Sequence, residues 1–480
     1  MTERPEVASE FDVIVIGGGP VGENAADRAH KAGLSVVLVE RHLLGGECSF
    51  YACSPSKALL RPIHATRASQ RVQGSVGARL DPEGVLARRD AWINRIGTSD
   101  DFDDSGQVGW LDHVGIRLVR GEGRLVGERL VEVGERTLHA RYAVILATGS
   151  APLVPDIPGL REARPWTNRD ATTSQRLPER LAVIGGGVVA CELAQVYAAL
   201  GSSVTVVARS PRLLTRAEPF AGEAVAEALR RDGVDLRLGV QATAVSRLGT
   251  TGVVTLDLDD GTGLRADEVL VAAGRTPSTE GLGLESVGAL TDDDGFVVVS
   301  ERMEVSGVEG RHPWLYAVGD VNGRNLLTHM GKYQGRVCGD VIAARAKGLP
   351  DDGPALRDTA DDRGAPQAIF TDPQVCMAGL TESKARADGF TVRAVEYDMG
   401  AVPGAALQAD GYTGRAKAVV DEDRRVLLGV TFVGLAIVEH LYAATLAVTA
   451  EIPLDQLWHA VPAFPTTSEI WLRLLQAYGL

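Results

Sequence analysis

Two cysteines, Cys48 and Cys53, are the residues of this 480-residue chain best suited to redox chemistry. They stand in the stretch GGECSFYACSPSK, at positions 45–57, where a helix is predicted to start. A pair at this spacing can close a small disulfide ring, and a helix N-terminus stabilises a thiolate on Cys53. A zinc site needs further cysteine or histidine ligands nearby, and none stands at ligand spacing. We therefore expect a redox pair and no metal site, with two unrelated buried cysteines as the alternative.

A glycine motif near the N-terminus predicts a dinucleotide site. Gly17, Gly19 and Gly22 form the pattern GxGxxG between a predicted strand and a predicted helix, and Glu40 follows the next predicted strand. Such glycines let the backbone approach a pyrophosphate, and the acidic residue accepts hydrogen bonds from a ribose diol. The acidic residue favours an adenosine ribose without a 2′-phosphate, as in FAD or NAD.

A second motif of this kind lies in the middle of the chain. Gly185, Gly187 and Ala190 repeat the spacing, but no acidic residue follows the next predicted strand. Arg209 stands there instead, with further arginines just beyond it. A guanidinium group in place of a carboxylate suits a 2′-phosphate, so we expect NADPH. The alternative is a solvated basic loop on an NAD site, with NADH as the donor.

The elements that must position these residues form two βαβ units. Strand, helix and strand are predicted around the first motif at 11–16, 21–32 and 34–39, and around the second at 181–184, 188–200 and 203–207. The C-terminal part alternates strands and helices, at 414–420, 426–433, 437–450 and 467–477. This order predicts an α/β protein with two doubly wound, Rossmann-like nucleotide-binding domains and a C-terminal α+β domain.

Composition and charge narrow the function classes. The net charge is −14 and the sequence pI about 5.2, so the chain repels phosphate backbones and we expect no nucleic-acid partner. No apolar run is long enough for a membrane span, and the N-terminus does not resemble a signal peptide. Five cysteines are too few for a secreted disulfide framework. We expect a cytoplasmic protein.

The order of motifs along the chain resembles that of the FAD-dependent pyridine nucleotide-disulfide oxidoreductases, the family of lipoamide dehydrogenase, glutathione reductase and mercuric reductase. The resemblance covers almost the whole chain. It rests on the opening glycine motif and on the segments at 45–57, 147–149, 185–192, 273–277, 316–320 and 370–373.

The resemblance implies roles for further residues. Lys57 would lie near the flavin N5 and pair with Glu192, and Asp320 would bind the ribityl chain or a nearby phosphate. Cys53 would be the thiolate against the flavin, and Cys48 the outer thiol that attacks an incoming disulfide. The other residues that we expect to line the FAD and nucleotide sites are Gly46, Thr148, Gly149, Gly274, Thr328 and His329.

The same resemblance implies a division into domains and a homodimer in which both subunits build each active site. The expected divisions are an FAD-binding domain with the cysteine pair at 1–152, an NAD(P)H-binding domain at 153–276, a central domain completing the FAD site at 277–352 and a dimerisation domain at 353–480.

One position departs from the pattern of the family. Its disulfide reductases carry a His-Pro pair near the C-terminus, oriented by a glutamate, as an acid/base group for thiols. Here Pro465 and Glu469 fit, but Phe464 replaces the histidine. Phenylalanine cannot carry a proton, and general acid–base help is worth about a hundredfold to ten-thousandfold. His459, the nearest histidine in sequence, is the alternative proton carrier, although its backbone position is different.

The remaining cysteines, Cys191, Cys338 and Cys376, lie in apolar segments and are expected to be structural. The chain ends without the additional cysteine pair that mercuric reductase carries. The leading hypothesis is therefore an NAD(P)H-dependent flavoenzyme that reduces a quinone-like or other non-thiol small molecule. The alternatives are a disulfide reductase with a different proton donor and a redox-sensing flavoprotein subunit.

Overall fold

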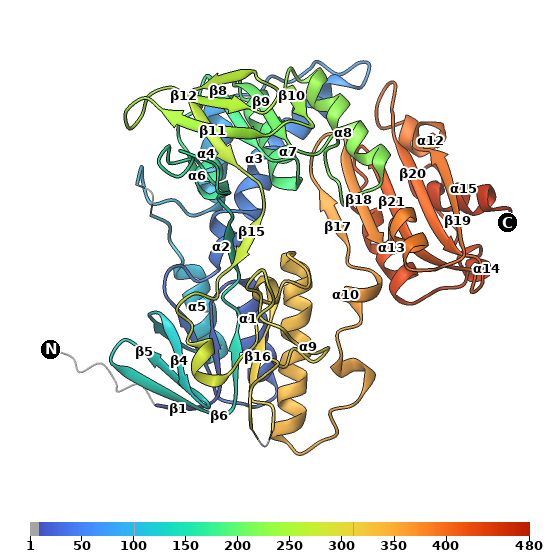
Figure 1. Ribbon diagram of the computed structural model, residues 1–480. Coiled ribbons are helices and arrows are strands. Elements are labelled where there is room, and N and C mark those ends of the chain that lie inside the picture. The colour runs from blue at the N-terminus through green and yellow to red at the C-terminus, as the bar shows by residue number, and fades with distance from the viewer. Residues whose placement is uncertain (1–8, 100, 311) are drawn as a thin grey trace. The chain divides into compact units, whose positions relative to one another are not determined.

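The computed structural model describes residues 9–99, 101–310 and 312–480, shown in Figure 1. The chain folds into two compact units, each built from three stretches of sequence. The first unit contains 1–54, 93–151 and 275–361, and the second contains 55–92, 152–274 and 362–480. The predicted α/β class is confirmed, with Rossmann-like sheets and a C-terminal α+β part. The four-part domain division stays a prediction.

The first unit is built on a seven-stranded sheet with the order β3-β2-β1-β6-β5-β4, and β16 pairs with β6. The pairs of β1 with β2 and β6, of β2 with β3 and of β16 with β6 are parallel. Its strands are β1 (Glu10–Ile16), β2 (Val36–Glu40), β3 (Arg117–Arg120), β4 (Gly123–Gly127), β5 (Leu130–Val133), β6 (Arg136–Leu146) and β16 (Leu315–Ala317). A two-stranded sheet joins β7 (Ser150–Pro152) to β15 (Arg275–Pro277).

Helices α1 (Pro20–Lys31) and α9 (Thr328–Ala346) pack side by side in this unit (Figure 1). Glycines at one-turn spacing on α9 make the approach possible, because a Cβ at Gly331 would lie 2.6 Å from the Val21 side chain and one at Gly339 2.8 Å from that of Arg28. The other helices are α2 (Gly46–Phe50), α5 (Ser105–Val114), the 3₁₀ turns η1 (Leu284–Val287), η2 (Gly319–Asn322) and η3 (Pro354–Leu356), and α10 (Ala360–Arg363) at the passage to the second unit.

The second unit contains a parallel four-stranded sheet, in the order β10-β9-β8-β14, and an antiparallel three-stranded one. The strands are β8 (Arg180–Ile184), β9 (Ser203–Ala208), β10 (Asp235–Leu238), β14 (Glu268–Val271), β11 (Ala242–Arg247), β12 (Val254–Leu258) and β13 (Gly263–Ala266). The helices are α3 (Cys53–Gln70), whose first two residues belong to the first unit, α4 (Pro82–Trp92), α6 (Asn168–Thr173), α7 (Val188–Ala199) and α8 (Pro219–Arg231).

The C-terminal part of the second unit is an antiparallel sheet of five strands, in the order β17-β18-β21-β20-β19. Its strands are β17 (Gln367–Ile369), β18 (Gln374–Gly379), β19 (Val392–Asp398), β20 (Arg415–Asp421) and β21 (Val426–Gly434). The helices are α11 (Glu382–Ala387), η4 (Met399–Ala401), α12 (Pro403–Ala406), α13 (His440–Thr449), α14 (Leu454–Leu457) and α15 (Glu469–Tyr478). Among the described residues, no helix combines the length and the apolar character that a membrane crossing requires.

Candidate active site

The cysteine pair lies on two short consecutive elements. Cys48 is within α2, and Cys53 is the first residue of α3. Both are partly buried, and no disulfide joins them here. A hydrogen bond with Cys53, together with burial, raises the pKa of the Cys48 thiol far above its ordinary value. The Cys48 thiol can therefore donate this hydrogen bond to the Cys53 sulfur.

A second contact to Cys53 comes from a distant part of the sequence. The Thr328 hydroxyl lies 3.4 Å from the Cys53 sulfur, and Thr328 is the first residue of α9. The N-termini of α3 and α9 therefore meet at this sulfur, and both macrodipoles stabilise negative charge there. The sequence placed Thr328 beside the flavin but gave no sign of this contact. His329, the next residue, is exposed.

Lys57 lies one helical turn after Cys53 on α3 and, in the second unit, forms an ion pair with Glu192. The Lys57 Nζ atom is 2.7 Å from Glu192 Oε2, and only 4% of the glutamate side chain is exposed. The other glutamate oxygen accepts a hydrogen bond from the Phe370 backbone N–H at 2.9 Å. The ammonium group also lies 4.9 Å from the centre of the Phe370 ring. These contacts fix the direction of the lysine side chain.

The first glycine motif has the geometry that a pyrophosphate site needs. Gly17 adopts a φ of +105°, and a Cβ there would lie 2.4 Å from the Ala147 carbonyl oxygen. A Cβ at Gly22 would lie 1.9 Å from the Gly17 carbonyl oxygen, so glycine alone permits the close packing of α1 on β1. At Gly19, in contrast, a Cβ would meet nothing within 4 Å. Open space before the N-terminus of α1 is where phosphates fit.

Two neighbouring features complete this cradle. Glu40 accepts hydrogen bonds from the backbone N–H groups of Gly18 at 2.7 Å and His42 at 2.6 Å, one on each carboxylate oxygen. Each oxygen keeps a lone pair for a ribose hydroxyl. Gly46 packs against the backbone of Gly19, where a Cβ would lie 2.9 Å from the Gly19 Cα. The residues present therefore fit the adenosine and pyrophosphate of FAD.

Asp320 lies in a polar cluster that the sequence did not predict in full. Its carboxylate accepts a hydrogen bond from the Ser150 hydroxyl at 2.5 Å, and Arg275 Nε lies 3.6 Å away. Arg275 in turn donates to the Ser150 hydroxyl and backbone carbonyl at 2.6 and 2.7 Å. Burial raises the pKa of Asp320. Sequence reasoning missed Ser150 because its partners are more than a hundred positions away.

Thr148 and Gly149, which follow β6, both form hydrogen bonds with Ser278. The Thr148 hydroxyl donates to the Ser278 carbonyl at 2.8 Å, and the Ser278 N–H donates to the Gly149 carbonyl at 3.0 Å. Both predicted residues therefore bind the residue that directly follows β15. Gly274, which belongs to the second unit, has a φ of +150° and accepts a hydrogen bond from the Leu153 N–H.

The second glycine motif repeats the geometry of the first in the second unit. A Cβ at Gly185 would lie 2.2 Å from the Ala272 carbonyl oxygen, whereas one at Gly187 would meet nothing within 4 Å. Ala190 is fully buried on α7. Arg209 follows the end of β9 and is exposed, as are Arg212 and Arg216. Among the described residues no carboxylate pairs with these three arginines, so they are available to an anionic ligand.

The C-terminal segment has no acid/base group at position 464, where the family resemblance expects a histidine. Phe464 is 73% exposed, and His459 is also exposed. Glu469, the first residue of α15, is buried, with one oxygen 3.9 Å from Arg473 Nη2 and the other without a hydrogen-bond partner in the described chain. A histidine that the sequence did not single out, His440, lies 2.6 Å from the Thr467 hydroxyl, and burial lowers its pKa.

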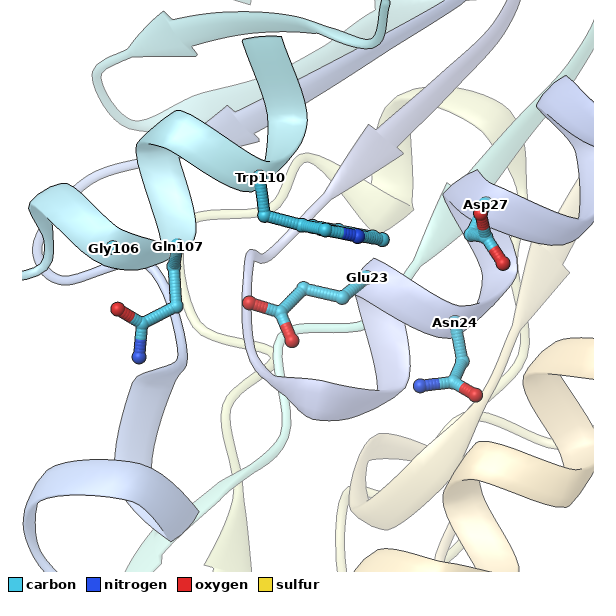
Figure 2. Close-up of a pocket in the computed structure, with 6 residues that line it drawn as sticks. All are labelled: Glu23, Asn24, Asp27, Gly106, Gln107 and Trp110. Atoms are coloured by element: carbon cyan, nitrogen blue, oxygen red, sulfur yellow. The ribbon is translucent and has the colours of Figure 1, made fainter. Parts of the chain in front are cut away.

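A separate cavity of about 330 Å³ lies between α1 and α5 (Figure 2). Its lining residues are Glu23, Asn24, Asp27, Gly106, Gln107 and Trp110. The Trp110 ring extends over Glu23, and burial raises the pKa of that carboxyl to about 7. None of these residues was a predicted site residue, because a single glutamate on a helix carries no recognisable pattern.

Comparison with known proteins decides the family. The sequence profile described as "Pyridine nucleotide-disulphide oxidoreductase" matches residues 11–346, and the profile of the corresponding dimerisation domain matches residues 365–474. The chain belongs to the pyridine nucleotide-disulphide oxidoreductase family. The resemblance drawn from the motifs is confirmed, and the protein is an FAD-dependent NAD(P)H oxidoreductase.

Members of the family with different substrates resemble the chain to a similar extent. A dihydrolipoyl dehydrogenase of Thermus scotoductus is 34% identical over 474 residues, which cover 97% of each chain. A mercuric reductase of Staphylococcus aureus is 31% identical over 466 residues, which cover 96% of this chain and 81% of that protein. The HOCl-induced flavoprotein disulfide reductase RclA of Escherichia coli, solved as a Cu(II) complex, superposes with a TM-score of 0.81 at 24% identity and covers 98% of this chain and 99% of that one.

Proposed function

We propose that this oxidoreductase takes electrons from NADPH and delivers them to a quinone-like or other non-thiol small molecule. The observation that carries the proposal is Phe464, an exposed side chain without a titratable group at the position where the resemblance expects a thiol acid/base. Reduction of a disulfide needs a proton for the leaving thiolate, whereas a quinone takes its protons from water. The absence of a proton carrier therefore handicaps the first reaction more than the second.

Bound FAD would supply the redox chemistry by accepting a hydride from the nicotinamide and passing the electrons on. The chain's own residues hold and orient the groups involved. Glu40 and the Gly17–Gly22 loop would bind the adenosine and pyrophosphate, and Asp320 the ribityl side. Lys57, fixed by Glu192, would place a positive charge beside the flavin ring. The Cys48–Cys53 pair lies beside this site as a second electron store.

Steady-state NADPH oxidation tests the acceptor. Wild type and a Cys48→Ser, Cys53→Ser double variant would be assayed with quinones, small disulfides, Hg(II) and Cu(II), the two ions because of the relatives named above. We expect quinone turnover in both proteins and little disulfide turnover in either. Substantial disulfide turnover that vanishes in the double variant would instead establish a disulfide reductase with an unconventional proton donor. Lack of turnover with every acceptor would favour a redox-sensing subunit.

A gain-of-function variant isolates the part played by Phe464. Phe464→His restores an imidazole, and we expect disulfide turnover to rise by one to two orders of magnitude while quinone turnover stays within about twofold. Val461→His is the matched control, because it places a histidine on an equally exposed residue of the same segment. Equal effects of the two substitutions would show that position 464 has no special role.

The preference for NADPH rests on the unpaired arginines after β9. Arg209→Ala removes one guanidinium group from the expected 2′-phosphate site, so we expect the KM for NADPH to rise about tenfold and the KM for NADH to stay nearly constant. Arg231→Ala, on the exposed end of α8, is the control. An equal change for both nucleotides would refute the assignment.

We also propose that the protein is a cytoplasmic homodimer. The match to the dimerisation domain supports the dimer, and so do large apolar side chains exposed on the C-terminal part, namely Tyr442, Leu446, Trp458, Val461 and Phe464. Five cysteines, too few for a secreted disulfide framework, and a nicotinamide donor suit a reducing compartment. Sedimentation equilibrium would give twice the 50.8 kDa chain mass for a dimer.

A further inference from the structure

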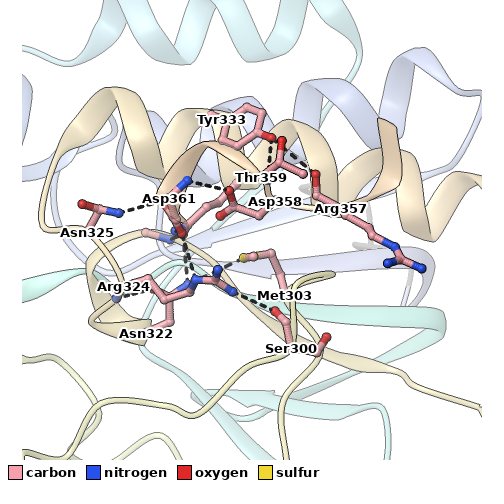
Figure 3. Close-up of polar contacts among 12 residues, drawn as sticks. Ser300, Met303, Asn322, Arg324, Asn325, Tyr333, Arg357, Asp358, Thr359 and Asp361 are labelled. Carbon is pink, nitrogen blue, oxygen red and sulfur yellow. Dashed lines mark hydrogen bonds and ion pairs between the residues drawn. The ribbon is translucent and has the colours of Figure 1, made fainter. Parts of the chain in front are cut away.

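Two buried carboxyl groups lie together where the first unit ends, on the segment that contains Asp358 and Asp361 (Figure 3). Asp358 is 1% exposed, and the Asp361 side chain is 4% exposed. The Asp361 backbone N–H donates to Asp358 Oδ1 at 3.2 Å. Asp358 Oδ2 is buried and has no hydrogen-bond partner among the described residues. A buried carboxylate oxygen without a partner is costly, so its protonation state matters.

The Asp361 carboxylate contacts three side chains, those of Arg324, Asn325 and Gln334. Its carboxylate accepts hydrogen bonds from Gln334 Nε2 at 2.9 Å and from Asn325 Nδ2 at 2.8 Å. The Arg324 Nε atom lies 2.9 Å from the same carboxylate, and Arg324 also donates to the Ser300 carbonyl at 3.2 Å. Both oxygens of Asp361 are thus occupied, and Arg324 is the cation that compensates its charge.

Gln334 connects Asp361 to the turn that carries Asp320, because it forms hydrogen bonds with both. Its side chain is fully buried on α9, and its Oε1 accepts from the Gly319 backbone N–H at 2.8 Å and from Asn322 Nδ2 at 2.9 Å. Gly319 and Asn322 are the ends of the 3₁₀ turn η2. The bond from Gln334 Nε2 to Asp361 fixes which way the amide faces, and therefore keeps its oxygen aimed at the turn.

Burial and the neighbouring carboxylate make Asp358 hold its proton up to about neutral pH. Burial raises the pKa of Asp358 to about 7, and a hydrogen bond from the protonated carboxyl to the Asp361 side chain and the charge of Asp361 act in the same direction, against a lowering by the Asp361 backbone N–H and by Arg324. On α9 the Tyr333 hydroxyl contacts only backbone, donating to the Arg357 carbonyl and accepting from the Thr359 N–H. The Asp358 N–H donates to the Glu301 carbonyl, and the Glu301 and Arg357 side chains pair with each other at 3.8 Å.

The two protonation states differ in what Asp361 can do. A protonated Asp358 can donate its O–H to Asp361, which gives the buried Oδ2 a partner and leaves the bonds to Gln334 and Arg324 intact. An ionised Asp358 puts two buried carboxylates beside one guanidinium group. Arg324 must then divide its charge between them, and the mutual repulsion weakens the position of Asp361.

We propose that Gln334 and Asp361 are positioning residues for the flavin-binding turn, and that loss of the proton from Asp358 loosens their hold on it. The proposal rests on the proposed binding of FAD by Asp320. It places no residue of the network in contact with the reacting atoms. Its consequence is that FAD is held less firmly above neutral pH than below it.

Release of FAD from the flavin-loaded protein tests this consequence. The rate of fluorescence increase after dilution would be measured between pH 5.5 and 9. In wild type we expect the rate to rise about tenfold across pH 7, the equivalent of one weakened hydrogen bond to a charged group. Asp358→Asn fixes the neutral form, so its rate should stay at the low-pH value throughout. Asp351→Asn, in the same stretch but only partly buried and paired with Arg345, should follow wild type.

A second variant changes the link between α9 and Asp361 itself. Gln334→Glu retains the acceptor for Gly319 but replaces the donor toward Asp361 with an ionisable oxygen, so its profile should become steeper than that of wild type. A wild-type profile in Asp358→Asn, or an unchanged profile in Gln334→Glu, overturns the proposal while FAD remains bound. A purified protein that holds no FAD would overturn the proposed function as well.

Discussion

The contact between Thr328 and Cys53 makes a quantitative prediction about thiolate reactivity. Thr328→Val keeps the shape of the side chain and removes the hydroxyl that lies 3.4 Å from the cysteine sulfur. A hydrogen bond to a charged group is worth about 1.5–3 kcal/mol, and the length of this contact favours the lower figure. Since about 1.4 kcal/mol is a factor of ten, the thiolate fraction at pH 6 should fall about tenfold.

Alkylation by iodoacetamide measures that fraction, because only the thiolate reacts. The assay would use the flavin-loaded protein in a Cys48→Ser background, with intact mass reporting a single adduct. Burial raises the pKa of Cys191 and Cys376 to about 12 and that of Cys338 higher still, so these three thiols stay unreactive. Thr328→Ser retains the hydroxyl and is the matched control.

The pH dependence separates this effect from a general disturbance of the site. At a pH high enough to ionise the cysteine in every variant, the rates of Thr328→Val, Thr328→Ser and the parent should converge. Equal rates at pH 6 would show that the hydroxyl does not stabilise the thiolate. A tenfold deficit that persists at high pH would mean that the substitution blocks access, and the reasoning from hydrogen bonding would be refuted.

Two further predictions concern stability. The usual pKa of the Glu23 carboxyl is 4.5, and burial raises it to about 7 in the folded protein. The folded state therefore binds the proton more tightly, and the stability of the wild type should decline by up to about 3 kcal/mol as the pH rises from 4.5 to 7. Glu23→Gln should remove this decline in thermal unfolding compared at pH 5 and pH 8, and an equal decline in the variant would contradict the prediction. Lys57→Met leaves the buried Glu192 carboxylate with one backbone partner and should lower the free energy of unfolding by about 1–2 kcal/mol. Adding Glu192→Gln in the same chain should largely restore this stability. Lys31→Met, which breaks an exposed ion pair, is the control and should lower it by less than about 0.5 kcal/mol.

The glycine motifs were predictable because each residue constrains its own backbone. Gly17 and Gly185 both adopt positive φ values, and both would clash with a carbonyl oxygen if they carried a Cβ. Gly19 and Gly187 both face open space. Such requirements operate within a few residues, so a single sequence displays them. Two cysteines at a helix start are local features as well, and their role as a redox pair stays a prediction.

The ends of elements were less predictable, because long-range contacts determine them. The sequence predicted a helix at 437–450, whereas α13 covers His440–Thr449. The backbone N–H groups of Ile437 and Val438 donate to the Gln374 side chain of β18, a residue more than sixty positions earlier. A side chain so far away captures donors that the periodicity assigns to the helix, and no local pattern reports it.

The contacts that set the chemistry of the site were out of reach for the same reason. Thr328 reaches Cys53 across 275 positions, and Gln334 joins Gly319 to Asp361 inside one unit. Their residue types are ordinary, and their partners belong to other segments of the chain. Residue spacing describes one segment of the sequence, whereas the roles of Thr328 and Gln334 depend on contacts between several segments.

Glu469 shows how a residue can fit a family pattern without the function that the pattern implies. In the resembling reductases a glutamate at this position orients a histidine, so its presence here suggests a concealed acid/base group. The structure gives one carboxylate oxygen of Glu469 a local role that needs no histidine. Glu469 is the first residue of α15, where the helix dipole stabilises a carboxylate, and Arg473 lies one turn further on at 3.9 Å. Retention of Glu469 therefore carries no argument for thiol chemistry, and the acceptor must be decided by Phe464 and by assay.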